Sequence, residues 1–188
     1  MARILIILAL SSGALYAAAP VRFDLRDANG TRHTAEEWRA KKAVVLFFTM
    51  TDCPLANGYV PEMNRMRAAY EARGVVFYAV QADNTASDAA VKEYAQEFGY
   101  TFPMLNDSQL TLARLTGAKV TPEVAVLSPT GEVLYLGRID NKVEDLTHPR
   151  YAATEPELRN ALDALLAGKA PKEAKTRAVG CSINLESK

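Results

Sequence analysis

Cysteine is scarce in this sequence, whose 188 residues include only two, Cys53 and Cys181. They lie far apart in the chain, so neither belongs to a C-x-x-C motif, and the clustered cysteines of a structural zinc site are missing. Two cysteines still permit one disulfide if the protein is exported to an oxidising compartment. The cysteine content therefore excludes a local dithiol and leaves a long-range pair open.

The chain also has no net charge of either sign. The chain has 22 Lys plus Arg and 22 Asp plus Glu, so its formal net charge is zero and no strong field favours nucleic acid or an anionic membrane. The compact apolar stretch from Ile4 to Leu10 is too short to span a bilayer. With 49% apolar residues, a chain of this length suits one globular domain with a sizeable core.

The first residues have the pattern of a signal peptide. Arg3 precedes the apolar stretch from Ile4 to Leu10, and Ala17 to Ala19 offer an A-x-A cleavage site, although Pro20 leaves the cut point open. We therefore expect residues 1–19 to be a signal peptide, with an uncleaved N-terminal anchor as the alternative. Either way, the expected location is periplasmic or otherwise extracytoplasmic.

Cys53 is the most informative residue that is present. It closely follows the apolar run 43–48, which predicts a buried strand, and Pro54 comes directly after it at the first position of a predicted helix. The backbone dipoles and free N–H groups of a helix N-terminus favour the thiolate, which is the nucleophilic form of cysteine. The pattern indicates a reactive cysteine; the alternative is a small buried apolar side chain at the end of a strand.

The order of the remaining segments predicts an α/β fold with a central mixed sheet and helices on both faces. Strands are expected near 21–25, 43–48, 75–80, 124–127 and 133–136, and helices near 34–40, 54–73, 87–98, 107–117 and 154–168. Thr34 with Glu37, and Thr154 with Glu157, have the spacing of capping boxes. His33 is expected on the solvated surface. This pattern divides the chain into the signal peptide, a domain at 20–168 and a C-terminal tail at 169–188.

At this point the chain resembles the thioredoxin superfamily, and within it the exported redoxins of the TlpA-like and AhpC-TSA peroxiredoxin-like kind. The matching residues include Phe23 to Leu25, Lys42 to Phe48, Cys53-Pro54, Pro61, Phe102-Pro103, Gly117, Thr121-Pro122-Glu123 and Gly131. The resemblance covers about residues 21–139. It implies a thioredoxin-like fold, an active-site role for Cys53, a cis peptide bond at Pro122, and substrate contacts by Pro54, Thr121 and Pro122.

Several residues differ from the redoxin motifs, and these differences limit the reactions that the site is expected to catalyse. Ala56 stands where a C-x-x-C motif has its second cysteine, and Asn57 stands where Sco-type copper proteins have theirs. Leu46 and Met50 replace the proline and the threonine or serine of the peroxiredoxin motif, and the catalytic arginine of that family would fall near Pro122. Without these groups we do not expect efficient peroxide reduction, unless the Arg138 side chain lies near Cys53 and takes the place of the missing arginine.

In many two-cysteine redoxins the resolving cysteine arrives from far along the chain, which makes Cys181 the natural partner of Cys53. Gly180 gives the tail backbone freedom. The Gly-Arg-Ile-Asp segment at 137–140 and the Gly-Cys-x-Ile tail also resemble a subgroup of bacterial redoxins. We expect the tail to close back on the active site, either within one chain or across to a second subunit.

The resulting prediction is a thiol–disulfide oxidoreductase with a possible thiol-dependent antioxidant role, in which Cys53 is the nucleophile and Cys181 resolves it. No cofactor is expected. The expected partner is a protein or small molecule carrying a thiol or disulfide, and the chain is a monomer or homodimer. The alternatives are copper binding by Cys53, Cys181 and His148 in the manner of a metallochaperone, and a non-catalytic binding module with a structural disulfide.

Overall fold

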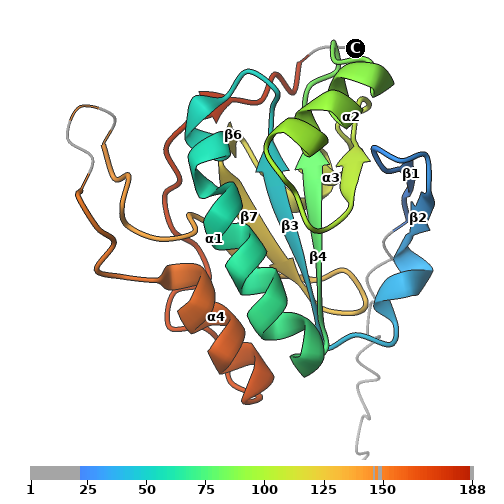
Figure 1. Cartoon of the computed structure of the whole chain (residues 1–188). Helices are drawn as coiled ribbons and strands as arrows, with labels where there is room; N and C mark the ends of the chain where they lie inside the picture. Colours follow the sequence, from blue (N-terminus) through green and yellow to red (C-terminus); the bar gives the residue numbers. More distant parts are fainter. Residues whose placement is uncertain (1–21, 146, 148–149, 187–188) are drawn as a thin grey trace, which may run out of the picture.

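A five-stranded mixed sheet forms the centre of the molecule (Figure 1). The computed structural model describes residues 22–145, 147 and 150–186, so the predicted signal peptide at 1–19 and the candidate ligand His148 lie outside the described residues. The strands are β3 (Ala43–Thr49), β4 (Val75–Gln81), β5 (Met104–Asn106), β7 (Glu123–Leu127) and β8 (Val133–Gly137). Their order is β5-β4-β3-β7-β8, with β3, β4 and β5 parallel and β7 and β8 antiparallel to their neighbours.

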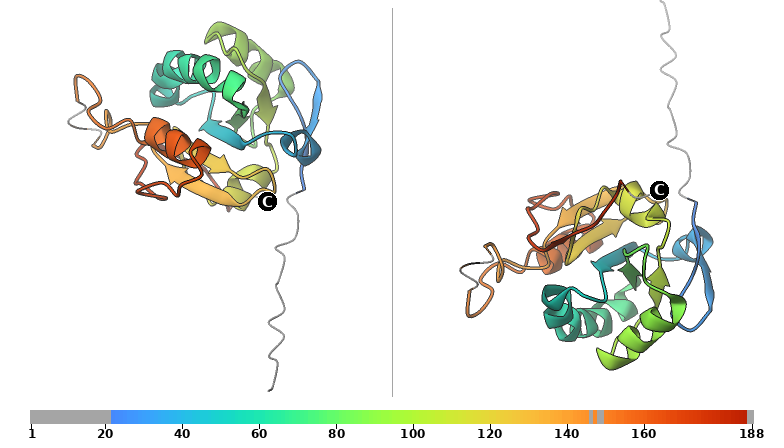
Figure 2. Two further views of the ribbon diagram at one scale, coloured as in Figure 1. Left: turned by 90° about the horizontal axis from the view of Figure 1, so that it is seen from below. Right: turned by 90° about the horizontal axis from the view of Figure 1, so that it is seen from above.

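Helices cover both faces of this sheet, which confirms the predicted fold class (Figures 1 and 2). The helices are η1 (Ala35–Trp38, a 3-10 helix), α1 (Pro54–Tyr70), η2 (Glu71–Arg73, also 3-10), α2 (Asp88–Glu97), α3 (Thr111–Thr116) and α4 (Glu157–Leu166). Because side chains alternate along a strand, β3 serves two cores. Val45 and Phe47 pack with α1, α2 and α4, whereas Val44, Leu46 and Phe48 pack with η1 and α3.

Helix α1 carries the predicted site residues. Pro54 occupies its first turn, Pro61 lies inside it, and Gly74 ends the η2 extension with a φ of 91°, close to the expected end. The stripe of Met63, Met66 and Tyr70 is buried in the core, as its helical spacing indicates. No helix in the described part of the chain is both long enough and apolar enough to cross a membrane.

Three short strands have too few residues to show a periodicity. They are β5 in the central sheet, and β6 (Val120–Thr121) and β9 (Cys181–Ser182), which pair with each other. A hairpin of β1 (Asp24–Arg26) and β2 (Arg32–Thr34) lies beside β5, where Ala28 donates its N–H to the Met104 carbonyl at 2.8 Å. Only the start of this hairpin was expected from the sequence, as a strand near 21–25.

Neither predicted capping box is formed in full. Thr34 is the N-cap residue of η1, as predicted, but its side chain makes no cap hydrogen bond. Glu37 contacts the His33 ring and the Tyr78 hydroxyl, 2.9 and 2.8 Å away. These contacts also bury His33, against the expectation of a solvated surface residue. At the last helix Pro156 is the N-cap residue, so Thr154 does not cap it.

Glu157, the first residue of α4, forms an ion pair with Arg138. Asp107, at the start of the helix expected near 107–117, caps α3. Its carboxylate accepts the backbone N–H groups of Thr111, Leu112 and Ala113 at 2.7 to 3.1 Å, from outside the first turn of α3.

The tail returns to the sheet after α4. It first lies beside β8, where the Leu136 N–H donates to the Ala174 carbonyl and the Thr176 N–H donates to the Leu136 carbonyl. It then continues to β9, which brings Cys181 opposite Thr121. The red segment in Figure 1 follows this path along the molecule.

Candidate functional site

Cys53 lies where β3 has ended and α1 begins. It is the N-cap residue of α1, with an extended backbone (φ −98°, ψ 97°), and its side chain is fully buried. Its N–H donates to the Met50 carbonyl at 3.1 Å, and its own carbonyl accepts the N–H of Asn57 at 3.2 Å. The apolar strand and the proline that follows Cys53 therefore place its sulfur at a helix N-terminus, as the sequence predicts.

The peptide bond between Thr121 and Pro122 is cis, and it faces Cys53. The Cys53 thiol donates a hydrogen bond to the Thr121 carbonyl, with 3.1 Å between sulfur and oxygen. Glu123 supports this turn, because its Oε2 accepts the Lys119 N–H at 2.7 Å and the Val120 N–H at 3.4 Å. Residues far apart in the sequence thus form one wall of the site.

Cys181 supplies the second sulfur. Strand β9 pairs antiparallel with β6, so Cys181 faces Thr121, and its Sγ lies 2.7 Å from the Sγ of Cys53. Both cysteines are free thiols, and the Cys181 thiol donates toward the Cys53 sulfur. A disulfide needs a sulfur–sulfur distance of about 2.05 Å. The two side chains therefore meet without any rearrangement of the fold.

Burial raises the pKa of the Cys181 thiol to about 11, and the hydrogen bond to Cys53 and the charge of Cys53 add to this effect. At neutral pH Cys181 therefore keeps its proton. The neighbouring Thr121 hydroxyl works in the opposite direction and lowers the same pKa. A protonated Cys181 is consistent with a resolving cysteine, which loses its proton only when it attacks the Cys53 sulfur.

A buried cluster of hydroxyl groups beside this site has no signal in the sequence. Tyr94 donates to the Asn57 side-chain oxygen at 2.6 Å and lies 2.8 Å from Thr49 Oγ1, and the Tyr100 hydroxyl donates to Thr49 at 3.3 Å. Burial raises the pKa of Tyr94 and Tyr100, and the charge of Cys53 contributes to both shifts. The cluster ties the first turn of α1 to the end of β3.

Two alternatives from the sequence depend on Arg138 and on a metal site. Arg138 does not stand free for a substrate, because its guanidinium pairs with Glu157 at 2.6 Å and with Glu144 at 3.2 Å. No group of three or more His, Cys, Asp and Glu side chains suited to a metal ion occurs among the residues that the structure describes. His148 is outside that set.

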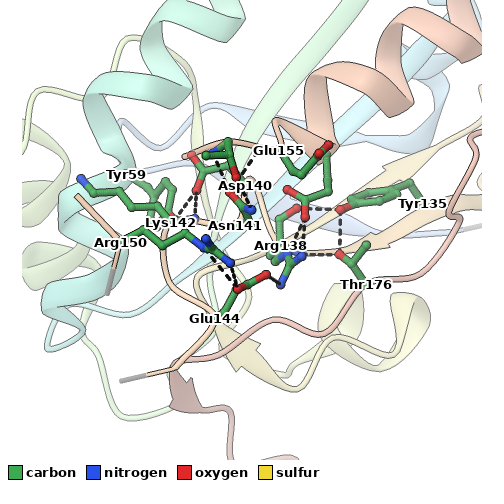
Figure 3. A network of polar contacts seen from close by, with 12 residues as sticks. Tyr59, Tyr135, Arg138, Asp140, Asn141, Lys142, Glu144, Arg150, Glu155 and Thr176 are labelled. Carbon is green, nitrogen blue, oxygen red and sulfur yellow. Dashed lines mark hydrogen bonds and ion pairs between the residues drawn. The ribbon is translucent and has the colours of Figure 1, made fainter. Parts of the chain in front are cut away.

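A cavity of about 500 Å³ opens between the first turns of α1 and the segment after β8. Pro54, Leu55 and Tyr59 line it from the helix, and Asp140 and Val143 line it from the other side. The Tyr59 hydroxyl donates to Asp140 at 2.7 Å across this gap (Figure 3). Pro54 is exposed here, so it is accessible to a molecule that approaches the start of α1.

Comparison with known proteins identifies relatives. A family model described as the AhpC/TSA family matches residues 17–136. The thiol-disulfide oxidoreductase ResA of Geobacillus thermodenitrificans is 30% identical over 111 residues, which are 59% of this chain and 62% of that protein. ResA of Halalkalibacterium halodurans is 27% identical over 128 residues, 66% of this chain and 71% of that protein. The match thus leaves more than a third of the first relative's length uncovered.

Among solved structures, an uncharacterized conserved protein from Geobacillus kaustophilus superimposes with a TM-score of 0.77. It is 27% identical in sequence, and the superposition covers 90% of this chain and 91% of that protein. The shared architecture therefore extends over most of this chain and most of that protein.

Proposed function

The chain belongs to the AhpC/TSA family of thioredoxin-like redoxins, and on this basis we propose that it is an exported thiol–disulfide oxidoreductase with Cys53 and Cys181 as its redox pair. Its distant relatives are thiol-disulfide oxidoreductases. The observation that carries the proposal is the 2.7 Å contact between the two sulfur atoms at the start of α1. The signal-peptide pattern at residues 1–19 supports the proposed export.

The proposed reaction has two exchange steps. The Cys53 thiolate attacks one sulfur of a substrate disulfide, so a mixed disulfide forms and the other substrate sulfur leaves as a thiolate. Cys181 then loses its proton and attacks the Cys53 sulfur, which releases the second substrate thiolate. In sum, one substrate disulfide is reduced to two thiols, and the Cys53–Cys181 pair is oxidised to a disulfide.

Thr121, Pro122 and Pro54 are the proposed substrate contacts. The Thr121 carbonyl lies against the Cys53 sulfur, and Pro122 fixes its direction through the cis bond. Pro54 is the exposed residue beside the buried nucleophile. The partner that we propose is a disulfide-bearing protein or small molecule, and a separate thiol donor returns the pair to its reduced state. No bound cofactor enters either step.

The pair is proposed to form within one chain. Cys181 meets Cys53 through the pairing of β9 with β6 of the same chain, so no second subunit is needed to complete the site. A copper site gains no support from the described residues, which contain no group of three suitable ligands. A purely structural disulfide is tested by the reduction potential, considered at the end of the Discussion.

The proposal can be tested by trapping the mixed disulfide. The reduced Cys181→Ser variant, mixed with an oxidised model peptide, should accumulate a peptide linked to Cys53, because the second step is blocked. The Cys53→Ser variant should accumulate far less under the same conditions. Mass spectrometry identifies the linked residue. Equal trapping by the two variants, or no trapping by either, would contradict the assigned roles.

A further inference from the structure

Two glycines in the redoxin-like motifs of this chain mark close contacts between the C-terminal tail and the rest of the fold. A Cβ atom added to Gly137 would lie 2.1 Å from Thr176 Oγ1, and one added to Gly180 would lie 2.0 Å from the Thr121 carbonyl oxygen. Real Cβ atoms do not approach other heavy atoms this closely, so neither position accepts a side chain without a shift of the backbone. The tail is therefore closely packed at two points before Cys181, against Gly137 at Thr176 and against Thr121 at Gly180.

Thr176 holds the tail before Cys181. Its Oγ1 accepts the Arg138 N–H at 3.0 Å and lies 2.8 Å from the Tyr135 hydroxyl (Figure 3). The one proton of Tyr135 goes to the Arg138 carbonyl at 2.7 Å. The Thr176 hydroxyl therefore donates to the Tyr135 oxygen, and it uses both its donor and its acceptor capacity.

Ile183 holds the tail after Cys181. Its side chain is 6% exposed and packs in the second core with residues of α3. Its N–H donates to the Lys119 carbonyl at 2.9 Å, which extends the short pairing of β9 with β6 by one hydrogen bond. Burial of this apolar side chain adds to that hydrogen bond in holding the tail.

Cys181 lies between these two fixed points, with residues 177–180 on one side and Ser182 on the other. A thiol on a short segment held at both ends has a high effective concentration at its target, whereas a thiol on a loose tail does not. The two fixed points also affect how easily a substrate reaches Cys53, because the Cys53 side chain is fully buried with the tail in this position.

We propose that Thr176 and Ile183 are positioning residues, which together form a clasp that holds Cys181 on Cys53. The clasp rests on the proposed function, since it acts through the Cys53–Cys181 pair. Release at Ile183 uncovers Cys53 for a substrate, while Thr176 keeps the tail close enough to return. The clasp therefore raises the equilibrium constant for the Cys53–Cys181 disulfide and slows the alkylation of reduced Cys53.

The test measures the equilibrium constant between the full-length protein and glutathione by quantifying the Cys53–Cys181 disulfide. Thr176→Val keeps the shape but removes the hydroxyl, and it should lower the constant about tenfold, which is about 30 mV. Ile183→Ala should lower it at least as much and should speed the alkylation of Cys53. Thr176→Ser retains the hydroxyl and should restore the wild-type value. Ser182→Ala, at an exposed position beside Cys181, is the matched control and should change neither quantity.

Hydrogen exchange of the unmodified reduced protein gives a second measurement that needs no variant to fold. The amide of Thr176 should be strongly protected, and that of Ile183 should exchange faster but remain protected. Equilibrium constants for Thr176→Val and Ile183→Ala that equal the Ser182→Ala value would overturn the clasp, as would unprotected amides at both positions. A wild-type protein that forms no reversible disulfide would instead overturn the proposed function.

Discussion

The sulfur atoms of Cys53 and Cys181 lie 2.7 Å apart, although 128 positions separate the two residues in the chain. One is fixed by a strand and a helix of the central fold, and the other by a two-residue strand of the tail. The second position of a C-x-x-C motif is Ala56 in this chain. The tail thus supplies the second thiol beside Cys53, which the local sequence around Cys53 does not provide.

Mild oxidation of the purified protein should give a monomer with one intramolecular disulfide. The reason is that β9 reaches β6 within the same chain, so the thiols meet at any protein concentration. Non-reducing electrophoresis should show a single monomeric species, and peptide mapping should link Cys53 to Cys181. A dimer that disappears on addition of a thiol would show instead that the tail crosses to a second subunit.

Hydrogen peroxide should be a poor substrate. Met50 occupies the position of the hydroxyl residue in the peroxiredoxin motif, and Arg138 is held by Glu157 and Glu144. Loss of one donor to a developing charge typically lowers a rate by a factor of about 100 to 1,000. The second-order rate constant for oxidation of Cys53, with Cys53→Ser as the blank, should fall at least about 100-fold below that of an efficient peroxiredoxin. A rate constant that matches such an enzyme would reveal donors not identified at this site.

The stability of the reduced protein should fall at alkaline pH. The pKa of Cys181 is raised from 9.0 to about 11, chiefly by burial. Between these values the unfolded thiol ionises while the folded one keeps its proton, so the stabilising difference is complete below pH 9 and is lost as the pH rises through 11. Urea unfolding under reducing conditions at pH 8 to 11 should show a steeper decline for wild type than for Cys181→Ser. Parallel curves would contradict the assignment.

Asp107 should be important for the stability of α3. Its carboxylate is fully buried and accepts three backbone N–H groups, which would lose their partner in Asp107→Ala. We expect a loss of about 2 kcal/mol or more in the free energy of unfolding. Asp107→Asn keeps one acceptor oxygen and should lose less. Chemical denaturation measures both, and an unchanged midpoint for Asp107→Ala would show that the helix start finds other partners.

The long apolar strands and α1 could be predicted from the sequence because a run of buried residues, a proline at the helix start and a glycine at its end are local signals. The position of Cys53 at the junction followed from them. The cis bond at Pro122 was expected only from the resemblance to redoxins, since X-Pro bonds in folded proteins are mostly trans.

Contacts between distant segments could not be predicted in this way. Thr49 and Tyr94 meet across 45 positions, and each is unremarkable in its own segment. Strands β6 and β9 have two residues each, so their pairing has no periodicity to detect. The capping boxes failed because the exact start of a helix is a weak local signal: the last helix begins only at Glu157, after the N-cap Pro156, and Glu37 and Glu157 have tertiary partners in Tyr78 and Arg138.

The reduction potential of the Cys53–Cys181 pair tests the central claim most directly. The protein is equilibrated in glutathione or dithiothreitol buffers of known potential, and the fraction of disulfide is determined by mass spectrometry after alkylation. A redox-active pair should titrate between about −120 and −270 mV, the range of dithiol oxidoreductases. A potential below about −300 mV would mark a structural disulfide, and the absence of any Cys53–Cys181 disulfide in the most oxidising buffer would likewise contradict the account.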